Sequence, residues 1–186
     1  MKVLKHELGH WLIARHLGFT VGDIQITIIK LDKKKSGANQ YTHSGSSKVF
    51  LEPTLKTFSD LHNYLDQRIQ VLYAGVLAQT HGQTLTDEEL GNVIALDAKG
   101  DQEKIEELSI LVRGWIRETD MDTTVLDQKT NEFITESWNK CKASIAELYP
   151  TLEKMANELA RVYKPEHRNL YKLDQLEILE STINAA

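Results

Sequence analysis

The residues best suited to chemistry stand almost at the start of the chain, where His6, Glu7 and His10 form an H-E-x-x-H pattern. On a helix, side chains four positions apart project from the same face, so both imidazoles can bind one zinc ion. Glu7 lies about 100° round the helix from His6, where it can reach a zinc-bound water without binding the metal. Zinc would lower the pKa of that water to about 7, and Glu7 would accept its proton as general base. The pattern therefore predicts a zinc hydrolase.

A catalytic zinc ion normally has three protein ligands and one open position, so a third ligand is needed. His16 has the spacing of the last histidine in the longer H-E-x-x-H-x-x-G-x-x-H pattern, but Ile13 stands where that pattern has its glycine. On a continuous helix His16 points away from His10. The other candidates are acidic residues much farther along the chain: Glu88, Glu89, Asp97 and Asp101.

The expected surroundings of these acidic residues differ. Glu88 and Glu89 fall in residues 83–97, which we expect to be a connection without regular structure. Asp97 would lie just outside the following helix and would point to water or cap that helix. Asp101 stands at the head of the helix, where it is either a surface residue that complements the helix dipole or an inward ligand. Spacing alone does not decide between these two roles.

The zinc pattern needs a helix, and residues 2–17 predict one, with Gly18 as its end. Apolar and polar residues alternate in residues 23–31, which predicts a strand with one apolar face. We expect residues 32–48 to form a loop or a weak hairpin partner, and residues 49–51 to form a short strand.

The rest of the chain predicts helices, because its apolar residues recur at helical spacing. The fold class is therefore mainly α (α+β), with a small β-sheet inserted after the first, metal-binding helix. We expect a single domain of residues 1–186, with that helix and the sheet in residues 1–56 and a helical body in residues 57–186. The expected helices of the body cover residues 57–80, 98–116, 123–148, 150–163 and 172–179, with Pro150 in the first turn of its helix.

Composition excludes several other classes of protein. The chain has 186 residues, of which 41% are hydrophobic and 26% charged, as in an ordinary globular domain. A net charge of −5 argues against a nucleic-acid partner. The single cysteine, Cys141, excludes an internal disulfide and fits a reducing compartment; we expect it to be a passive, half-buried thiol. We find no signal peptide and no apolar run long enough for a membrane span, and we expect a cytoplasmic protein.

Four short segments are informative as a set: residues 5–10 (KHELGH), 25–29 (QITII), 72–78 (LYAGVLA) and 97–101 (DAKGD). They resemble, in the same order, the Y-H-E-A-G-H, K-V-T-I-I, L-Y-G-G-R-x-A and G-A-S-N-D segments of the peptidase domain of FtsH-type ATP-dependent zinc metallopeptidases. The resemblance spans almost the whole chain. It implies that His6, His10 and Asp101 are the zinc ligands and that Glu7 is the catalytic base.

The chain also departs from this family. Gln79 and Thr80 stand where the family usually has two acidic residues, and Asp97 replaces a glycine. The distance in sequence from His10 to Asp101 is longer than usual. The ATPase module and the membrane anchor of the family are not found in this sequence, so we expect no unfolding of substrates by this chain alone.

The sequence therefore predicts a zinc metalloendopeptidase that hydrolyses peptide bonds in unfolded or extended polypeptides. The strand at residues 23–30 is expected to hold such a peptide along an exposed edge. A separate ATPase or regulatory protein as a partner, and an oligomer, stay open. One alternative is a zinc-containing interaction or regulatory module without proteolysis, although such a module would not need Glu7. Another is an all-α interaction domain in which the pattern arose by chance.

Overall fold

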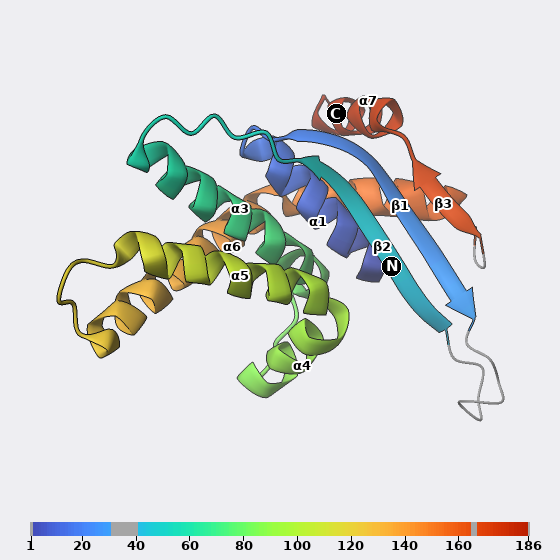
Figure 1. Cartoon of the computed structure of the whole chain (residues 1–186). Coiled ribbons are helices and arrows are strands. Elements are labelled where there is room, and N and C mark those ends of the chain that lie inside the picture. Colours follow the sequence, from blue (N-terminus) through green and yellow to red (C-terminus); the bar gives the residue numbers. More distant parts are fainter. Residues whose placement is uncertain (1, 31–40, 165–166, 186) are drawn as a thin grey trace.

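The computed structural model describes residues 2–30, 41–164 and 167–185. It is mainly helical with one three-stranded antiparallel sheet, which confirms the predicted fold class. In Figure 1, α1 lies between the sheet and the helices α3 and α6. The helices are α1 (Lys2–His16), α3 (Phe58–Thr80), α4 (Asp87–Asp97), α5 (Lys99–Ile116), α6 (Thr123–Val162) and α7 (Leu173–Asn184), and the strands are β1 (Thr20–Lys30), β2 (Tyr41–Phe50) and β3 (Arg168–Tyr171).

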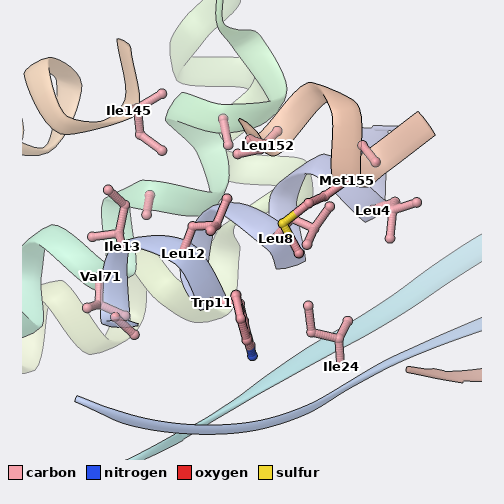
Figure 2. Packing of buried hydrophobic residues seen from close by; sticks show 14 of the residues in the cluster. Leu4, Leu8, Trp11, Leu12, Ile13, Ile24, Val71, Ile145, Leu152 and Met155 are labelled. Atoms are coloured by element: carbon pink, nitrogen blue, oxygen red, sulfur yellow. The ribbon is translucent and has the colours of Figure 1, made fainter. Parts of the chain in front are cut away.

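Helix α1 is the centre of the hydrophobic core. Leu4 and every residue from His6 to Ala14 are buried, so this helix has no solvent-exposed face along its middle. Figure 2 shows Leu8 packing among neighbours from α6, including Met155, while Trp11 lies towards the sheet. The zinc pattern is thus carried by the element with the most neighbours, and the packing of the core fixes its position.

Gly9 sets the distance between α1 and α3. A Cβ atom at this position would lie 2.6 Å from the Cβ of Ala78 and would also collide with the carbonyl oxygen of Ala74. The absence of a side chain therefore lets the two helices approach closely. This close approach matters for the site, because α3 supplies the groups that contact the two histidines.

The sheet has the strand order β2-β1-β3, so β1 is its central strand. Ile24 and Ile26 are fully buried on one face of β1, as the alternating pattern predicts, and they pair with Ser47 and Gly45 of β2. Residues 24–27 of β1 also pair with β3. The prediction that the strand at residues 23–30 offers an exposed edge is therefore wrong over these residues. Within the described part of the sheet, β2 has its outer edge unpaired.

Two further predictions about the first part of the chain need correction. Of the two alternatives for residues 32–48, the hairpin partner is confirmed from residue 41 onwards, but residues 41–50 form one continuous strand and not a separate short strand at residues 49–51, because they pair with β1 along almost its whole length. The part of the predicted loop at residues 32–40 lies outside the described residues. Residues 83–97 are not a plain connection, since α4 occupies residues 87–97. Thr86 and Glu89 form a capping box at its start, which is a readable signal for a helix.

The predicted break at Pro150 is absent, because α6 continues through it from residue 123 to residue 162. Proline removes one backbone hydrogen bond, but burial on both sides keeps the helix together. Cys141 and Ile145 are buried before the proline, and Leu152 and Met155 are buried after it. Strand β3 was not predicted, since four residues are too few for a clear alternating pattern.

Candidate metal centre

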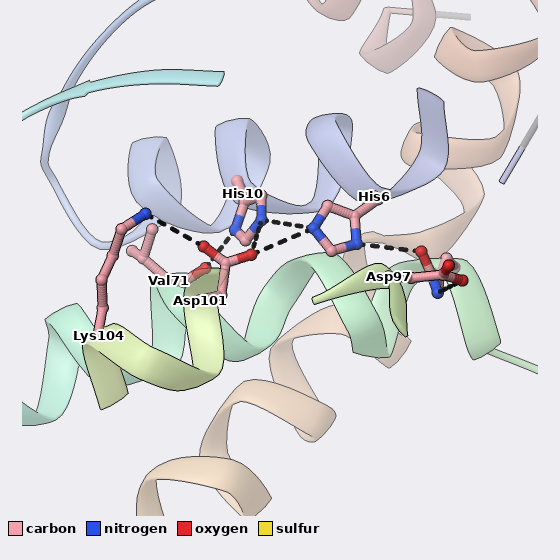
Figure 3. Close-up of polar contacts among 7 residues, drawn as sticks. His6, His10, Val71, Asp97, Asp101 and Lys104 are labelled. Atoms are coloured by element: carbon pink, nitrogen blue, oxygen red, sulfur yellow. Dashed lines mark hydrogen bonds and ion pairs between the residues drawn. The ribbon is translucent and has the colours of Figure 1, made fainter. Parts of the chain in front are cut away.

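Three side chains from two helices converge: His6 and His10 from α1, and Asp101 from the first turn of α5. The Nε2 atoms of the two histidines are 3.0 Å apart. The Oδ2 atom of Asp101 lies 3.3 Å from Nε2 of His6 and 3.1 Å from Nε2 of His10. Figure 3 shows dashed lines from the carboxylate of Asp101 to both rings. The structure thus brings together the same three residues that the family resemblance implies.

Hydrogen bonds at the far side of each ring determine which nitrogen carries the hydrogen. Nδ1 of His10 lies 2.6 Å from the carbonyl oxygen of Val71, which can only accept. Nδ1 of His6 lies 3.0 Å from Oε1 of Gln79, and Nε2 of Gln79 donates to Oδ2 of Asp97 over 3.0 Å. Because Asp97 accepts from the amide nitrogen, the amide oxygen faces His6. Both Nδ1 atoms are therefore donors, and in the neutral rings both Nε2 atoms carry lone pairs.

Positive charge would therefore be stabilised at the centre of the cluster formed by His6, His10 and Asp101. Two lone pairs and a carboxylate oxygen face one another there, so a proton or a metal cation has to lie among them. Burial would raise the pKa of the Asp101 carboxyl, but hydrogen bonds from the protonated rings of His10 and His6 hold that pKa well below its ordinary value. Two imidazoles and one carboxylate are a ligand set that suits Zn²⁺, and each imidazole already has the outer hydrogen bond typical of zinc-binding histidines.

Gly75 of α3 provides the room for this cluster. A Cβ atom there would lie 2.5 Å from Nε2 of His10 and nearer still to Nε2 of His6. Any side chain at this position would thus occupy the space into which both nitrogen atoms point. This space fits a metal ion, and Gly75 belongs to the LYAGVLA segment that resembles the zinc-peptidase family.

Glu7 lies beside the cluster without belonging to it. Its side chain is buried and faces β2, where a Cβ atom on Gly45 would lie 2.6 Å from Cδ of Glu7. Burial raises the pKa of the Glu7 carboxyl to about 7, with a contribution from Asp101, although His6 and the backbone N–H of Ser47 act in the opposite direction. A carboxyl group with a pKa near neutrality can both accept and return a proton.

One cavity of about 850 Å³ is lined by all four candidate residues: His6, Glu7, His10 and Asp101. Residues 44–47 of β2 form part of its wall, and α3 and α5 contribute Arg68 and Lys104. The cavity is open to solvent and mostly polar, so a polypeptide segment could reach the cluster. The groups that could do chemistry are therefore accessible from outside although their side chains are largely buried.

The other candidate ligands lie elsewhere. His16 is exposed at the end of α1, and Glu88 and Glu89 are exposed on α4, where Glu89 caps the helix. Asp97 is exposed, as expected, and it also accepts a hydrogen bond from Gln79. Gln79 was not predicted to contact the site, yet it accepts from or donates to groups on both sides of it, His6 and Asp97. Its position three residues after Val76 on the face of α3 that meets α1 was the available signal.

Cys141 is more deeply placed than predicted. It is fully buried rather than half-buried, and its Sγ lies 3.1 Å from the carbonyl oxygen of Gln70. Burial raises the pKa of its thiol to about 12, so the side chain stays protonated and unreactive in the folded protein. It takes no part in the metal cluster.

Comparison with known proteins returns no relative for this chain: no family model matches it, and no curated protein matches it. Among the described residues, no helix is both long enough and apolar enough to cross a membrane. The function is therefore inferred below from the residues of the site and their geometry.

Proposed function

We propose that this protein is a zinc-dependent peptidase that hydrolyses peptide bonds in unfolded or extended polypeptides. The observation that carries the proposal is the convergence of His6, His10 and Asp101, with both Nε2 lone pairs directed at one point and Glu7 beside them. When bound there, zinc supplies a Lewis acid that polarises the scissile carbonyl and makes water a better nucleophile.

The role of Glu7 in this reaction is proton transfer. Its carboxylate accepts a proton from the attacking water and then gives that proton to the nitrogen of the leaving amine. The buried position of Glu7 and its raised pKa suit both steps. A zinc site without catalysis would gain nothing from a buried carboxyl group that costs free energy to ionise. This consideration favours the peptidase over a zinc-containing interaction module.

Two outer hydrogen bonds orient the histidines for this chemistry. The carbonyl of Val71 holds the ring of His10, and the amide of Gln79 holds the ring of His6. Asp97 in turn fixes the amide of Gln79. Each Nε2 atom is thereby directed at the metal position before a metal arrives, which lowers the entropic cost of binding it.

The edge of β2 is the proposed place for the substrate. Residues 44–47 of this strand line the cavity, and no strand of the described sheet pairs with their outer edge, although the backbone N–H of Ser47 already bonds Glu7. An extended polypeptide can add to such an edge by β-augmentation. This geometry selects unfolded or extended chains, because the backbone of a folded substrate is already paired.

The resemblance to FtsH-type peptidases agrees with this proposal, since it gives the same three ligands and the same base. We extend the proposal to a cytoplasmic location, because the single cysteine suits a reducing compartment.

The test uses the purified protein loaded with zinc and a library of fluorescence-quenched peptides. Wild type is expected to cleave members of the library, and the Glu7→Gln variant is expected to retain zinc and lose at least about 99% of the rate. A chelator should abolish cleavage, and added zinc should restore it. Cleavage at the wild-type rate by Glu7→Gln would refute the role of Glu7. A zinc-loaded wild type that cleaves no peptide and no unfolded protein would refute the peptidase proposal.

A further inference from the structure

Arg68 is a half-buried basic residue of the cavity that has no acidic partner within the described residues. It lies on α3 and lines the cavity together with His10, Asp101 and Lys104. The structure gives its guanidinium group no hydrogen bond and no ion pair in the described ranges 2–30, 41–164 and 167–185. Removing part of the water around a guanidinium group without supplying a counterion costs free energy. An anion that binds from solution would offset this cost.

The environment of the Arg68 guanidinium agrees with this interpretation. Burial lowers the pKa of this group, whereas Tyr64 and Asp101 raise it. Asp101 thus lies near enough to raise the pKa of the Arg68 guanidinium but forms no ion pair with it. Asp101 faces the two histidines with Oδ2 and Lys104 with Oδ1, and no ion pair joins it to Arg68 within the described residues.

The position of Arg68 along the cavity follows from α3. Val71 contacts His10 and Gln79 contacts His6. Residues earlier in α3 therefore lie nearer the His10 end of the site, and later residues lie nearer the His6 end. Arg68 stands three residues before Val71, which places it about 4.5 Å farther along the helix axis. It therefore lies beyond His10, on the side away from His6.

A second cation lies at the same end of the cavity. Nζ of Lys104 is 3.5 Å from Oδ1 of Asp101, and Figure 3 shows Lys104 at the His10 end of the cluster and Asp97 at the His6 end. Lys104 is more than half exposed, with 55% of its side chain accessible, so it contributes charge at the rim rather than a fixed contact.

We propose that Arg68 binds a carboxylate of the substrate next to the scissile bond, with Lys104 adding positive charge at the rim. The inference rests on the proposed function, because it assumes that cleavage occurs at His6, His10 and Asp101. Because Arg68 lies beyond His10 along the cavity, the recognised residue lies on the His10 side of the cleaved bond. The planar guanidinium fork matches a carboxylate with two parallel hydrogen bonds. That carboxylate belongs either to an acidic side chain or to the C-terminus of the substrate.

Three fluorescein-labelled peptides of one parent sequence distinguish these cases. The first is neutral and amidated, the second is amidated with one internal glutamate, and the third is neutral with a free C-terminus. Their binding is measured by fluorescence anisotropy on Glu7→Gln protein, which does not cleave them, both with zinc and without it. Arg68→Gln removes the charge in the same background, and Arg68→Lys keeps the charge without the fork. The control is Arg113→Gln, since Arg113 pairs with Asp127 away from the cavity.

We expect one of the two carboxylate peptides to bind about tenfold more tightly than the neutral one, with and without zinc. Arg68→Gln should abolish this preference, Arg68→Lys should reduce it, and Arg113→Gln should leave it unchanged. Equal binding of all three peptides would overturn the inference. So would a preference that survives Arg68→Gln, because a group other than Arg68 would then be binding the carboxylate. Cleavage by wild type is measured separately. A preference that depends on Arg68, without any cleavage, would support the anion site and refute the peptidase proposal. Cleavage without such a preference would support the peptidase proposal and refute the anion site.

Discussion

Gly75 of α3 lies directly against Nε2 of His10, at a distance that leaves no room for a methyl group. This relationship makes a glycine in the middle of a helix part of the candidate metal centre. Glycine is unfavourable at such a position by about 1 kcal/mol relative to alanine, so its presence needs a reason. The space that it leaves for the two imidazoles supplies that reason.

The first prediction follows from this space. Gly75→Ala should lose most of its bound zinc, because the new Cβ would occupy the place where the two Nε2 atoms meet. Zinc content after dialysis, measured by mass spectrometry, gives the result. The matched control is Gly114→Ala on α5, where a Cβ would have nothing within 4 Å. The control should keep its zinc and gain about 0.5–1 kcal/mol in urea unfolding. Full zinc content in Gly75→Ala would place the metal elsewhere.

The second prediction separates Asp101 from Asp97. Asp101→Asn should lose zinc and activity, since a neutral amide is a poor ligand for this cation. Asp97→Asn should keep the capacity for one zinc ion but bind it about tenfold more weakly, because a neutral amide oxygen accepts more weakly than a carboxylate and holds Gln79 less firmly towards His6. Competition with a chromogenic chelator measures both affinities. His16→Ala is the control and should match wild type. Equal affinities for Asp101→Asn and wild type would remove Asp101 from the ligand set.

The third prediction concerns the position of Glu7. A Cβ on Gly45 would displace the carboxylate of Glu7 without touching the histidines, so Gly45→Ala should keep its zinc but lose about tenfold or more in kcat. Gly22→Ala on β1 is the comparison, since its Cβ would meet the flexible side chain of Lys48 instead. Peptide cleavage and zinc content are measured on both variants. An unchanged kcat in Gly45→Ala would show that the geometry around Glu7 does not limit the reaction.

The fourth prediction concerns pH and Cys141. Burial raises the pKa of this thiol from its ordinary value of 9.0 to about 12 in the folded protein. Between these two values the unfolded chain loses the proton while the folded chain keeps it, so stability falls as the pH rises through this range. At pH 10 the loss attributable to this group should be about 1 kcal/mol. Unfolding of wild type and Cys141→Ala by urea, each followed from pH 8 to pH 10, isolates the contribution, which the alanine variant should lack.

Thiol-specific labelling gives an independent check on this last point. The buried thiol should react only after the protein unfolds, at the rate at which the protein opens. Rapid labelling of the native protein at neutral pH would contradict the buried position of Cys141.

The sequence predicts those parts of the site that depend on local periodicity. His6 and His10 converge because they are four residues apart on one helix, and α1 follows from its own apolar pattern. Asp101 is different, because its meeting with α1 depends on how α5 packs in three dimensions. Only the resemblance to a known family selected it over Glu88, Glu89 and Asp97.

What the sequence missed depends on tertiary contacts. The hydrogen bonds from Asp97 through Gln79 to His6 involve three separate helices, so no spacing rule reveals them. The same holds for β1, whose central place in the sheet depends on β3 returning from the far end of the chain. The continuous α6 is a case in which burial on both sides outweighs the local effect of Pro150.

The burial of α1 along its middle has a consequence for how the proposed site can change. A helix that carries the reactive groups and also fills the centre of the core cannot shift or bend to suit a new substrate, because every neighbour would have to repack. Variation in what the protein accepts is therefore confined to the rim of the cavity, where β2 and the exposed side chains of α5 can change without disturbing the interior. Over evolutionary time, diversification of specificity should leave α1 nearly unaltered and alter the surface opposite it.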